Sequence, residues 1–441
     1  MAQPGDTVMI APGRYGPFNG MAKGTKTRPI VYRAEKKWGA VIDLGTSGLS
    51  KRAAVLAESE IGTVAAVHAK ANTVLQGLSF ENGGPGWGGG IAPDEPGVTA
   101  TDCRFRNIGL GVGLNKEHQD CDTCHLIRCV FEDMYTGAVW SHAITGPQNP
   151  CNTNAGATAT ECEQTARWNL DMRVQDHRMI DCIIRRANIS NISPCMAMGA
   201  LKYLFTKDMV IDGLVSYDNN GTGFWMDWDS WNFVIKNCTF FGNHAGAHPQ
   251  DGNCWWAGVG CWSEGNDFGA WLNNVSYGNG AGGFGILETG FANIDDYDYN
   301  DHPDGGQVRF EGNVIVDNPR GIEFRFCLRT PSNHSGGPVI MKNNVFKGWT
   351  TKAWDFGDPF TQNDVTVADA GWVIEGNIYD NSKNADILAE WTHSPCTVEG
   401  GYGYGGAKHC DISIQNRTAC ATIEQMRDLL DIEHEGSTES Y

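Results

Sequence analysis

A short apolar motif recurs along most of this chain and restricts its fold more than any other feature. The motif reads apolar-apolar-x-(Asn, Gly or Cys)-apolar, and its copies mostly lie about 24 to 38 residues apart, with longer gaps from Val74 to Leu126 and from Leu126 to Met179. Each repeat contains apolar runs of three to five residues that are bounded by Gly or Asn and are too short for helices. One repeat cannot bury its own apolar face, whereas stacked repeats share a continuous core. The motif starts at Val74, Leu126, Met179, Val210, Val234, Trp271, Phe310, Ile340 and Val373.

This pattern predicts an all-β fold, a single-stranded right-handed parallel β-helix solenoid with loop insertions, over residues 1–392. Small or polar residues at the recurring turn suit left-handed backbone and allow Asn side chains to stack in a ladder. An antiparallel β-propeller is the rival fold, but it would need hairpin turns at two-residue spacing that the sequence lacks. Residues 393–441 are expected to form a Cys/Gly-rich extension in which 422–430 make a short capping helix.

The first residues suggest how the solenoid begins. The segment 4–15 resembles the first coil of pectate-lyase-like β-helix proteins, where a capping helix normally comes first. No such helix and no signal peptide precede it, so we expect a leader to have been removed. Fifteen Cys and several Asn-x-Ser/Thr sequons favour an oxidising compartment and a secreted protein. Asn220, Asn274, Asn333 and Asn416 are among these sequons.

The negative charge of the chain limits the classes of molecule that it is expected to bind. The formal net charge is −19 over 441 residues. Such a field repels nucleic acid and anionic membrane surfaces, and it disfavours polyanionic substrates unless metal ions or a basic patch intervene. No apolar run approaches the roughly 20 residues of a membrane span. A neutral or cationic polysaccharide or oligosaccharide fits best, and the sequence leaves the oligomeric state open.

Polar and aromatic side chains follow the turn in successive repeats. Equivalent residues of neighbouring coils lie about 4.8 Å apart, so we predict one column on one face of the solenoid. Insertions at about 143–172, 244–257, 290–306 and 327–337 would wall a groove beside it. The column would hold His142, Lys202, Asp227, Glu264, Glu288 and Glu323, with Trp140, Trp225, Trp228 and Trp262 beside it. Tyr203, Asp229 and Arg325 complete the predicted substrate contacts.

Two acids in this set could catalyse glycoside cleavage. Asp227 and Glu264 fall on adjacent coils. Retaining glycosidases use two carboxyl groups about 5 to 5.5 Å apart, one as nucleophile and one as general acid/base. Two carboxylates at that distance do not both ionise readily, which would keep one protonated as the acid. The alternative is that these acids form a plain solvated face.

The same segments resemble a known family. Ala200-Leu201-Lys202-Tyr203, Gly223-Phe224-Trp225-Met226-Asp227-Trp228 and Trp262-Ser263-Glu264-Gly265-Asn266 are similar to the β-helix core of glycoside hydrolase family 120, which contains retaining β-xylosidases. The resemblance implies Asp227 as nucleophile, Glu264 as acid/base and Lys202 as a substrate contact. It is strong over about 70 residues. Here 37 residues separate the two acids, more than in the family, because of an insertion around 248–256, and Tyr203 replaces a family His.

Two other functional classes remain open. A polysaccharide lyase would need a base near the uronic acid C5 and a cation for its carboxylate; Lys202, Tyr203, His142 and Arg325 could serve. The acidic segment 295–301 could bind a structural Ca²⁺ through Asp296, Asp298 and Asn300, although a solvated loop explains it as well, and no cofactor is required. The third class is a non-enzymatic structural or adhesive solenoid.

The cysteines allow three interpretations. Cys121 and Cys124, with His118 and His125 nearby, could hold a metal ion, but no second Cys-x-x-Cys exists. Loop disulfides are favoured instead, with Cys151–Cys162, Cys254–Cys261 and a pairing among Cys396, Cys410 and Cys420 as candidates. Cys129, Cys182 and Cys238 occupy the repeat itself and are expected to form a buried thiol stack.

Overall fold

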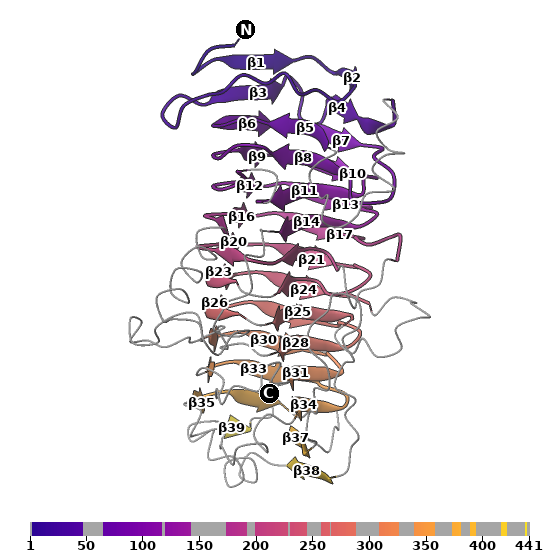
Figure 1. Ribbon diagram of the computed structural model, residues 1–441. Helices are drawn as coiled ribbons and strands as arrows, with labels where there is room; N and C mark the ends of the chain where they lie inside the picture. The colour runs from indigo at the N-terminus through magenta and orange to yellow at the C-terminus, as the bar shows by residue number, and fades with distance from the viewer. Residues whose placement is uncertain are drawn as a thin grey trace, which may run out of the picture.

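The chain winds into a right-handed parallel β-helix whose coils stack along one axis (Figure 1). The computed structural model describes residues 2–46, 65–116, 120–142, 173–191, 199–227, 230–244, 257–264, 266–287, 308–325, 339–357, 373–380, 389–393, 416–420 and 437–438. Three sheets, here called A, B and C, run along the solenoid. The first coil contributes named strands to sheets A and B, and each later coil adds a strand to A, then B, then C. All pairings between named strands are parallel except the last one in sheet C, so the propeller alternative was wrong.

The strands are short, as the repeat predicts. Sheet A contains β1 (Thr7–Ile10), β3 (Ile30–Ala34), β6 (Thr73–Gln76), β9 (Thr99–Thr101), β12 (His125–Ile127), β16 (Arg178–Ile180), β20 (Val210–Asp212), β23 (Trp231–Lys236), β26 (Asp267–Leu272), β29 (Val308–Glu311), β32 (Val339–Lys342) and β35 (Val373–Glu375), flanked by β15 (Val174–Gln175) and β19 (Thr206–Lys207). Sheet B contains β2 (Gly13–Tyr15), β4 (Ala40–Asp43), β7 (Ser79–Glu81), β10 (Arg104–Arg106), β13 (Val130–Glu132), β17 (Ile183–Arg185), β21 (Val215–Tyr217), β24 (Thr239–Phe241), β27 (Val275–Tyr277), β30 (Val314–Val316), β33 (Val345–Lys347), β36 (Ile378–Asp380) and β39 (Ser437–Thr438). Sheet C contains β5 (Ala65–Ala69), β8 (Gly89–Pro93), β11 (Leu110–Asn115), β14 (Gly137–His142), β18 (Lys202–Tyr203), β22 (Trp225–Met226), β25 (Val259–Glu264), β28 (Gly282–Leu287), β31 (Arg320–Arg325), β34 (Lys352–Gly357), β37 (Ala389–His393) and β38 (Asn416–Cys420). A 3₁₀ turn, η1 (Leu44–Thr46), follows β4.

The predicted motif is the turn from sheet A to sheet B. The first residue after the sheet A strand adopts a left-handed backbone in every copy, a conformation that Gly, Asn and Asp tolerate best. The same turn occurs at Asp102 after β9, a coil that the apolar pattern missed in the long gap between Val74 and Leu126. The left-handed residues of this turn are Gly77, Asp102, Arg128, Asp181, Gly213, Asn237, Asn273, Gly312, Asn343 and Gly376.

The next residue of this turn points inward, and its chemistry changes along the axis. In the first half it is a thiol at Cys103, Cys129 and Cys182, each fully buried, which confirms the predicted thiol stack for Cys129 and Cys182 and adds Cys103. The predicted third member, Cys238, is buried too, but Leu214 occupies this position on the coil between it and Cys182. From Cys238 onward the position becomes an asparagine ladder. Each Asn there accepts a hydrogen bond at Oδ1 from the backbone N–H of the preceding coil, at 2.8 to 2.9 Å. The ladder consists of Asn274, Asn313, Asn344 and Asn377.

A second asparagine ladder lines the turn from sheet B to sheet C. Its side-chain amides donate to the next Oδ1 at 2.8 to 3.1 Å. It consists of Asn219, Asn243, Asn279 and Asn318. Buried amides must find partners, and the two rows satisfy one another from coil to coil. Because Asn274 lies in the first ladder and is fully buried, its sequon is not an accessible glycan acceptor.

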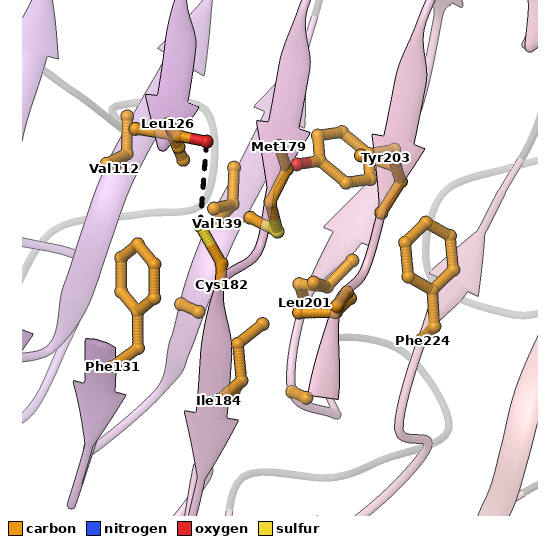
Figure 2. Close-up of a cluster of buried hydrophobic side chains, with 14 of the residues drawn as sticks. Val112, Leu126, Phe131, Val139, Met179, Cys182, Ile184, Leu201, Tyr203 and Phe224 are labelled. Atoms are coloured by element: carbon orange, nitrogen blue, oxygen red, sulfur yellow. Dashed lines mark hydrogen bonds between the residues drawn. The ribbon is translucent and has the colours of Figure 1, made fainter. Parts of the chain in front are cut away.

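Apolar side chains from all three sheets fill the interior. Figure 2 shows Leu201, Phe224 and Tyr203 pointing into this core beside Cys182. The Tyr203 hydroxyl lies 2.8 Å from His177 Nε2, and both side chains are fully buried. Burial, reinforced by neighbouring His125, lowers the pKa of His177 to about 3.

The first coil of the solenoid agrees with the sequence prediction. β1 and β2 form the first coil, as predicted from the segment 4–15. The proposed capping helix at 422–430 lies outside the described residues, and the boundary at 392/393 stays a prediction.

The predicted Cys254–Cys261 disulfide was wrong, because the Cys261 thiol is free, buried, and 3.8 Å from the Gly283 carbonyl oxygen. The other predicted disulfide partners fall outside the described residues or have no described side chain. Across the described chain, no helix has the length and apolarity that a membrane crossing requires.

Candidate active site

The outer face of sheet C carries the predicted polar residues, in two columns rather than one. The first column aligns Trp140, Lys202, Trp225, Trp262, Gly285, Glu323 and Asp355 on successive strands. The second column lies two residues further along each strand and contains Asp227 and Glu264, since Met226 pairs with Ser263. The single predicted column was therefore wrong. Gly283, not Gly285, is the residue equivalent to Gly260 and Gly321 at the corner where the chain enters sheet C.

Lys202 and Asp227 form a buried ion pair on this face. Lys202 Nζ lies 2.7 Å from Asp227 Oδ2, and the side chains are 6% and 10% exposed. The same ammonium sits 3.8 Å from the ring centroid of Trp225 and 5.2 Å from that of Trp140. Cation–π contacts of this kind strengthen when water is excluded. The strand order explains the cluster, because β14, β18 and β22 are neighbours in sheet C.

Glu264 has a different partner. The indole Nε1–H of Trp262 donates a 3.1 Å hydrogen bond to Glu264 Oε2. Both residues are on β25 and point outward, two positions apart, as period-2 alternation requires. Trp262 is fully buried and Glu264 is 7% exposed. Asp227 and Glu264 thus occupy equivalent positions on adjacent coils in unlike surroundings, one against a cation and the other against a neutral donor.

Sequence reasoning missed Asn266, which organises the chain just after both acids. Its amide Nδ2 donates to the Met226 carbonyl at 2.9 Å, and its Oδ1 accepts from the Ser230 backbone N–H at 3.1 Å. The Ser230 hydroxyl in turn donates to the Asp227 carbonyl at 3.1 Å. Asn266 is fully buried. The signal was present in the predicted family motif, where this Asn follows the acid by two residues.

Two bulky residues near these strands have left-handed backbones. Phe205, two residues after β18, has φ of 51°, and Phe268, at the start of β26, has φ of 48°. A Cβ-bearing aromatic residue in this region is strained, and such strain concentrates at functional sites. Phe268 is in register with Asn232, and Asn232 with Asp208, both of which also have left-handed backbones. The conformation at Phe268 therefore belongs to a recurring turn of the solenoid.

The predicted aromatic platforms are packed inside the protein. Trp140 is fully buried, and its ring meets Trp87 edge to face at 4.7 Å. Trp225 is 2% exposed. These indoles therefore pack around Lys202 and exclude water from it. They are not exposed surfaces on which a sugar could stack.

The other predicted site residues lie in different surroundings, and several have no described side chain. Glu323 is fully buried and paired with Arg320 at 2.9 Å, two coils from Trp262 in the first column. Tyr203 faces the core, so its predicted substrate contact was wrong; Lys202 and Tyr203 alternate across the strand, and only Lys202 points outward. Trp228, Asp229 and Glu288 lie outside the described residues, and His142 and Arg325 have described backbone only.

The two predicted metal sites lie in different parts of the chain. Among the described residues, no group of three or more His, Cys, Asp or Glu side chains is placed to hold a metal ion. Cys121 and Cys124 are buried free thiols in that part of the chain. Asp296, Asp298 and Asn300 lie outside it, so a structural Ca²⁺ stays a prediction.

Comparison with known proteins gives no family. No protein-family model and no curated protein matches the sequence. The solved structures it resembles include an alginate lyase from Paenibacillus sp. str. FPU-7, with 13% identity, a TM-score of 0.41, and coverage of 78% of this chain and 89% of that one. Pectate lyase Pel9A has 14% identity, a TM-score of 0.40, and coverage of 80% and 70%. The catalytic unit of a GH87 α-1,3-glucanase from Streptomyces thermodiastaticus has 11% identity, a TM-score of 0.44, and coverage of 87% and 64%.

Proposed function

We propose that this protein is a carbohydrate-active enzyme, and more narrowly a retaining glycoside hydrolase that uses Asp227 and Glu264. The observation that carries the proposal is the register of sheet C. Trp225 pairs with Trp262 and Met226 with Ser263, so the two acids that follow are equivalent on adjacent parallel strands. Adjacent strands are about 4.8 Å apart, which suits the separation of about 5 to 5.5 Å between the carboxyl groups of retaining enzymes.

The partners of the two acids favour one division of roles. A nucleophile has to be a carboxylate, and the Lys202 ammonium is a counter-ion for Asp227 in that form. A general acid/base has to be reversibly protonated, and Glu264 has a neutral indole donor at one oxygen. Both acids lie in surroundings that exclude most water, where fixed charges and dipoles act more strongly.

The reaction would proceed in two displacements. Asp227 attacks the anomeric carbon while Glu264 transfers its proton to the departing glycosidic oxygen, giving a glycosyl ester on Asp227 and a free alcohol. Glu264, now a carboxylate, takes a proton from water as that water attacks the same carbon. The ester bond breaks, and both side chains return to their starting protonation states.

The lyase alternative has weaker support. Tyr203 points into the core, and Lys202 is already bound to a carboxylate and two indole faces, which makes it a poor general base. The remaining candidate bases, His142 and Arg325, have no described side chains. An unsaturated uronic acid product, detected by its ultraviolet absorbance, would favour a lyase over the hydrolase.

The test assigns each acid separately. Wild-type protein is screened against 2,4-dinitrophenyl glycosides of common sugars, and the variants D227A and E264A are assayed on the sugar that is cleaved. Both variants should lose at least about 100-fold in kcat. Sodium azide should restore turnover in each, giving a glycosyl azide of retained configuration with E264A and of inverted configuration with D227A. Asp212→Asn removes an acid of an outer Lys–Asp pair on sheet A and is the matched control.

The outcomes separate the alternatives. Full activity of D227A would overturn the assignment of Asp227. A wild-type protein that cleaves no glycoside and releases no unsaturated product would favour the non-enzymatic solenoid. Export from the cell is proposed alongside this function, since polysaccharides are extracellular substrates, and fractionation of the producing cells tests it.

A further inference from the structure

The surroundings of Glu264 contain an arrangement that the reaction scheme does not use. Trp262 donates its indole N–H to Glu264 at 3.1 Å and is fully buried. Its ring does not stand upright on the sheet but lies across the next coil, over Gly285, with which it pairs in register. The position of the Trp262 ring, and with it the hydrogen bond to Glu264, therefore depends on the residue at position 285 of the neighbouring strand.

Gly285 is the residue that permits this position. A Cβ built on Gly285 would lie 1.8 Å from Trp262 Cε3 and 1.9 Å from Cζ3. No side chain fits at such a distance, so any residue other than glycine must displace the indole. Other positions of the first column carry Lys202, Trp225 and Glu323, so the sheet itself does not require glycine there.

We propose that Trp262 is a positioning residue for Glu264 and that Gly285 exists to seat its ring. This inference rests on the proposed function, because positioning an acid/base matters only if Glu264 acts as one. The indole N–H holds one carboxyl oxygen, Oε2, and so fixes the orientation in which the carboxyl group meets the leaving group. A side chain held in this way exchanges its proton along one direction, without first searching its rotamers.

The kinetic test uses the leaving group to separate positioning from general damage. Dinitrophenolate leaves without protonation, whereas phenolate of a phenyl glycoside needs the acid. In W262F and in G285A, kcat/KM for the phenyl glycoside should fall about tenfold or more, while kcat/KM for the dinitrophenyl glycoside of the same sugar changes less than about threefold. E264A should show the same selectivity more strongly.

Two matched controls are available in the same region. Gly282→Ala is on the same strand as Gly285, and its added Cβ would meet its nearest atoms at 3.5 to 3.9 Å, which is ordinary contact. Trp271→Phe removes another fully buried indole, whose Nε1 has no hydrogen-bond partner among the described residues. Both controls should change the two substrates by the same factor.

A second measurement does not depend on activity. In protein labelled with ¹⁵N at tryptophan, the indole N–H signal that W262F removes should shift in E264A and in G285A, and should stay in place in G282A. An unshifted signal in E264A would overturn the hydrogen bond and the inference with it. Equal losses on both substrates in W262F, with a selective loss in E264A, would also overturn the inference but leave the proposed function standing. Equal losses in E264A would overturn both.

Discussion

Lys202 Nζ and Asp227 Oδ2 meet at 2.7 Å on the outer face of sheet C, away from the apolar core and yet almost completely shielded from water. An ion pair in such a place costs desolvation on both sides, and it stabilises the fold only while both partners are present. This arrangement, together with the ladders inside the solenoid, allows four predictions.

Lys202→Met should lower the free energy of unfolding by about 3 to 5 kcal/mol, because it leaves the Asp227 carboxylate buried without its cation. Methionine keeps most of the side-chain volume between the indoles of Trp140 and Trp225. The double variant with D227N should be less destabilised than the sum of the two single variants. Urea denaturation of the four proteins measures this coupling, and strict additivity would contradict an energetic link between the residues.

Asn313→Ala should destabilise the protein by about 2 to 4 kcal/mol, because several buried groups lose their partners at once. The Asn313 amide donates to the Trp271 carbonyl at 3.0 Å, and its Oδ1 accepts from the Asn274 backbone at 2.9 Å. Asn220→Ala is the control, since its part-buried amide donates to the Asn188 carbonyl at 3.2 Å. A loss at Asn313 no larger than at Asn220 would show that the ladder adds little. Thermal unfolding of both variants gives the comparison.

Stability should fall as the pH drops below about 6.5, and His177 should account for part of the loss. Its pKa is about 3 in the folded protein, against 6.5 for an unburied histidine. Between these values the unfolded chain binds a proton that the folded chain does not, so folding weakens by up to about 1.4 kcal/mol per pH unit. Above 6.5 both states are neutral, and this contribution is fully present.

His177→Gln tests that sign, because glutamine can still bond the Tyr203 hydroxyl but does not titrate. The difference in unfolding free energy between pH 7.5 and pH 5 should be about 2 kcal/mol smaller in the variant than in the wild type. Equal pH dependence in the two proteins would show that His177 does not cause the loss.

Gly260→Ala should destabilise the protein by about 1 to 3 kcal/mol. The added Cβ would lie 2.2 Å from Ser276 Oγ and 2.7 Å from the Gly283 carbonyl oxygen at the crowded corner before sheet C. Gly282→Ala adds the same methyl group one coil later with ordinary contacts and should be near neutral. Chemical denaturation distinguishes them, and equal effects would contradict the corner argument.

The sequence predicts the solenoid because every coil requires the same left-handed turn between apolar runs. The strongest signal in the sequence, a polar residue or glycine at that turn, therefore recurs along the chain. It misses the coil at Thr99–Thr101, where Thr-Ala-Thr carries too little branched apolar surface to stand out. The register of sheet C is harder to predict, since Gly282, Gly283 and Gly285 all fit a turn position and only packing selects Gly283.

Side-chain direction explains the other errors at the site. β18 has only two residues, too few for alternation to show which of Lys202 and Tyr203 faces out. Asn266 carries no catalytic chemistry of its own, so the family motif contains it without showing what it does; its contacts to Met226 and Ser230 show that. The equivalence of Asp227 and Glu264, in contrast, follows from the repeat alone.

Because β22 pairs with β25, the spacing between Asp227 and Glu264 does not depend on the length of the chain that connects them. Asp227 and Glu264 are one coil apart however many residues connect them, and the segment 245–256 enters between β24 and β25 without altering their register. Such a scaffold can lengthen, shorten or exchange its connecting segments while the two acids keep their spacing. Under the proposed function, a connecting segment such as 245–256 could be exchanged by grafting without moving the two acids out of register.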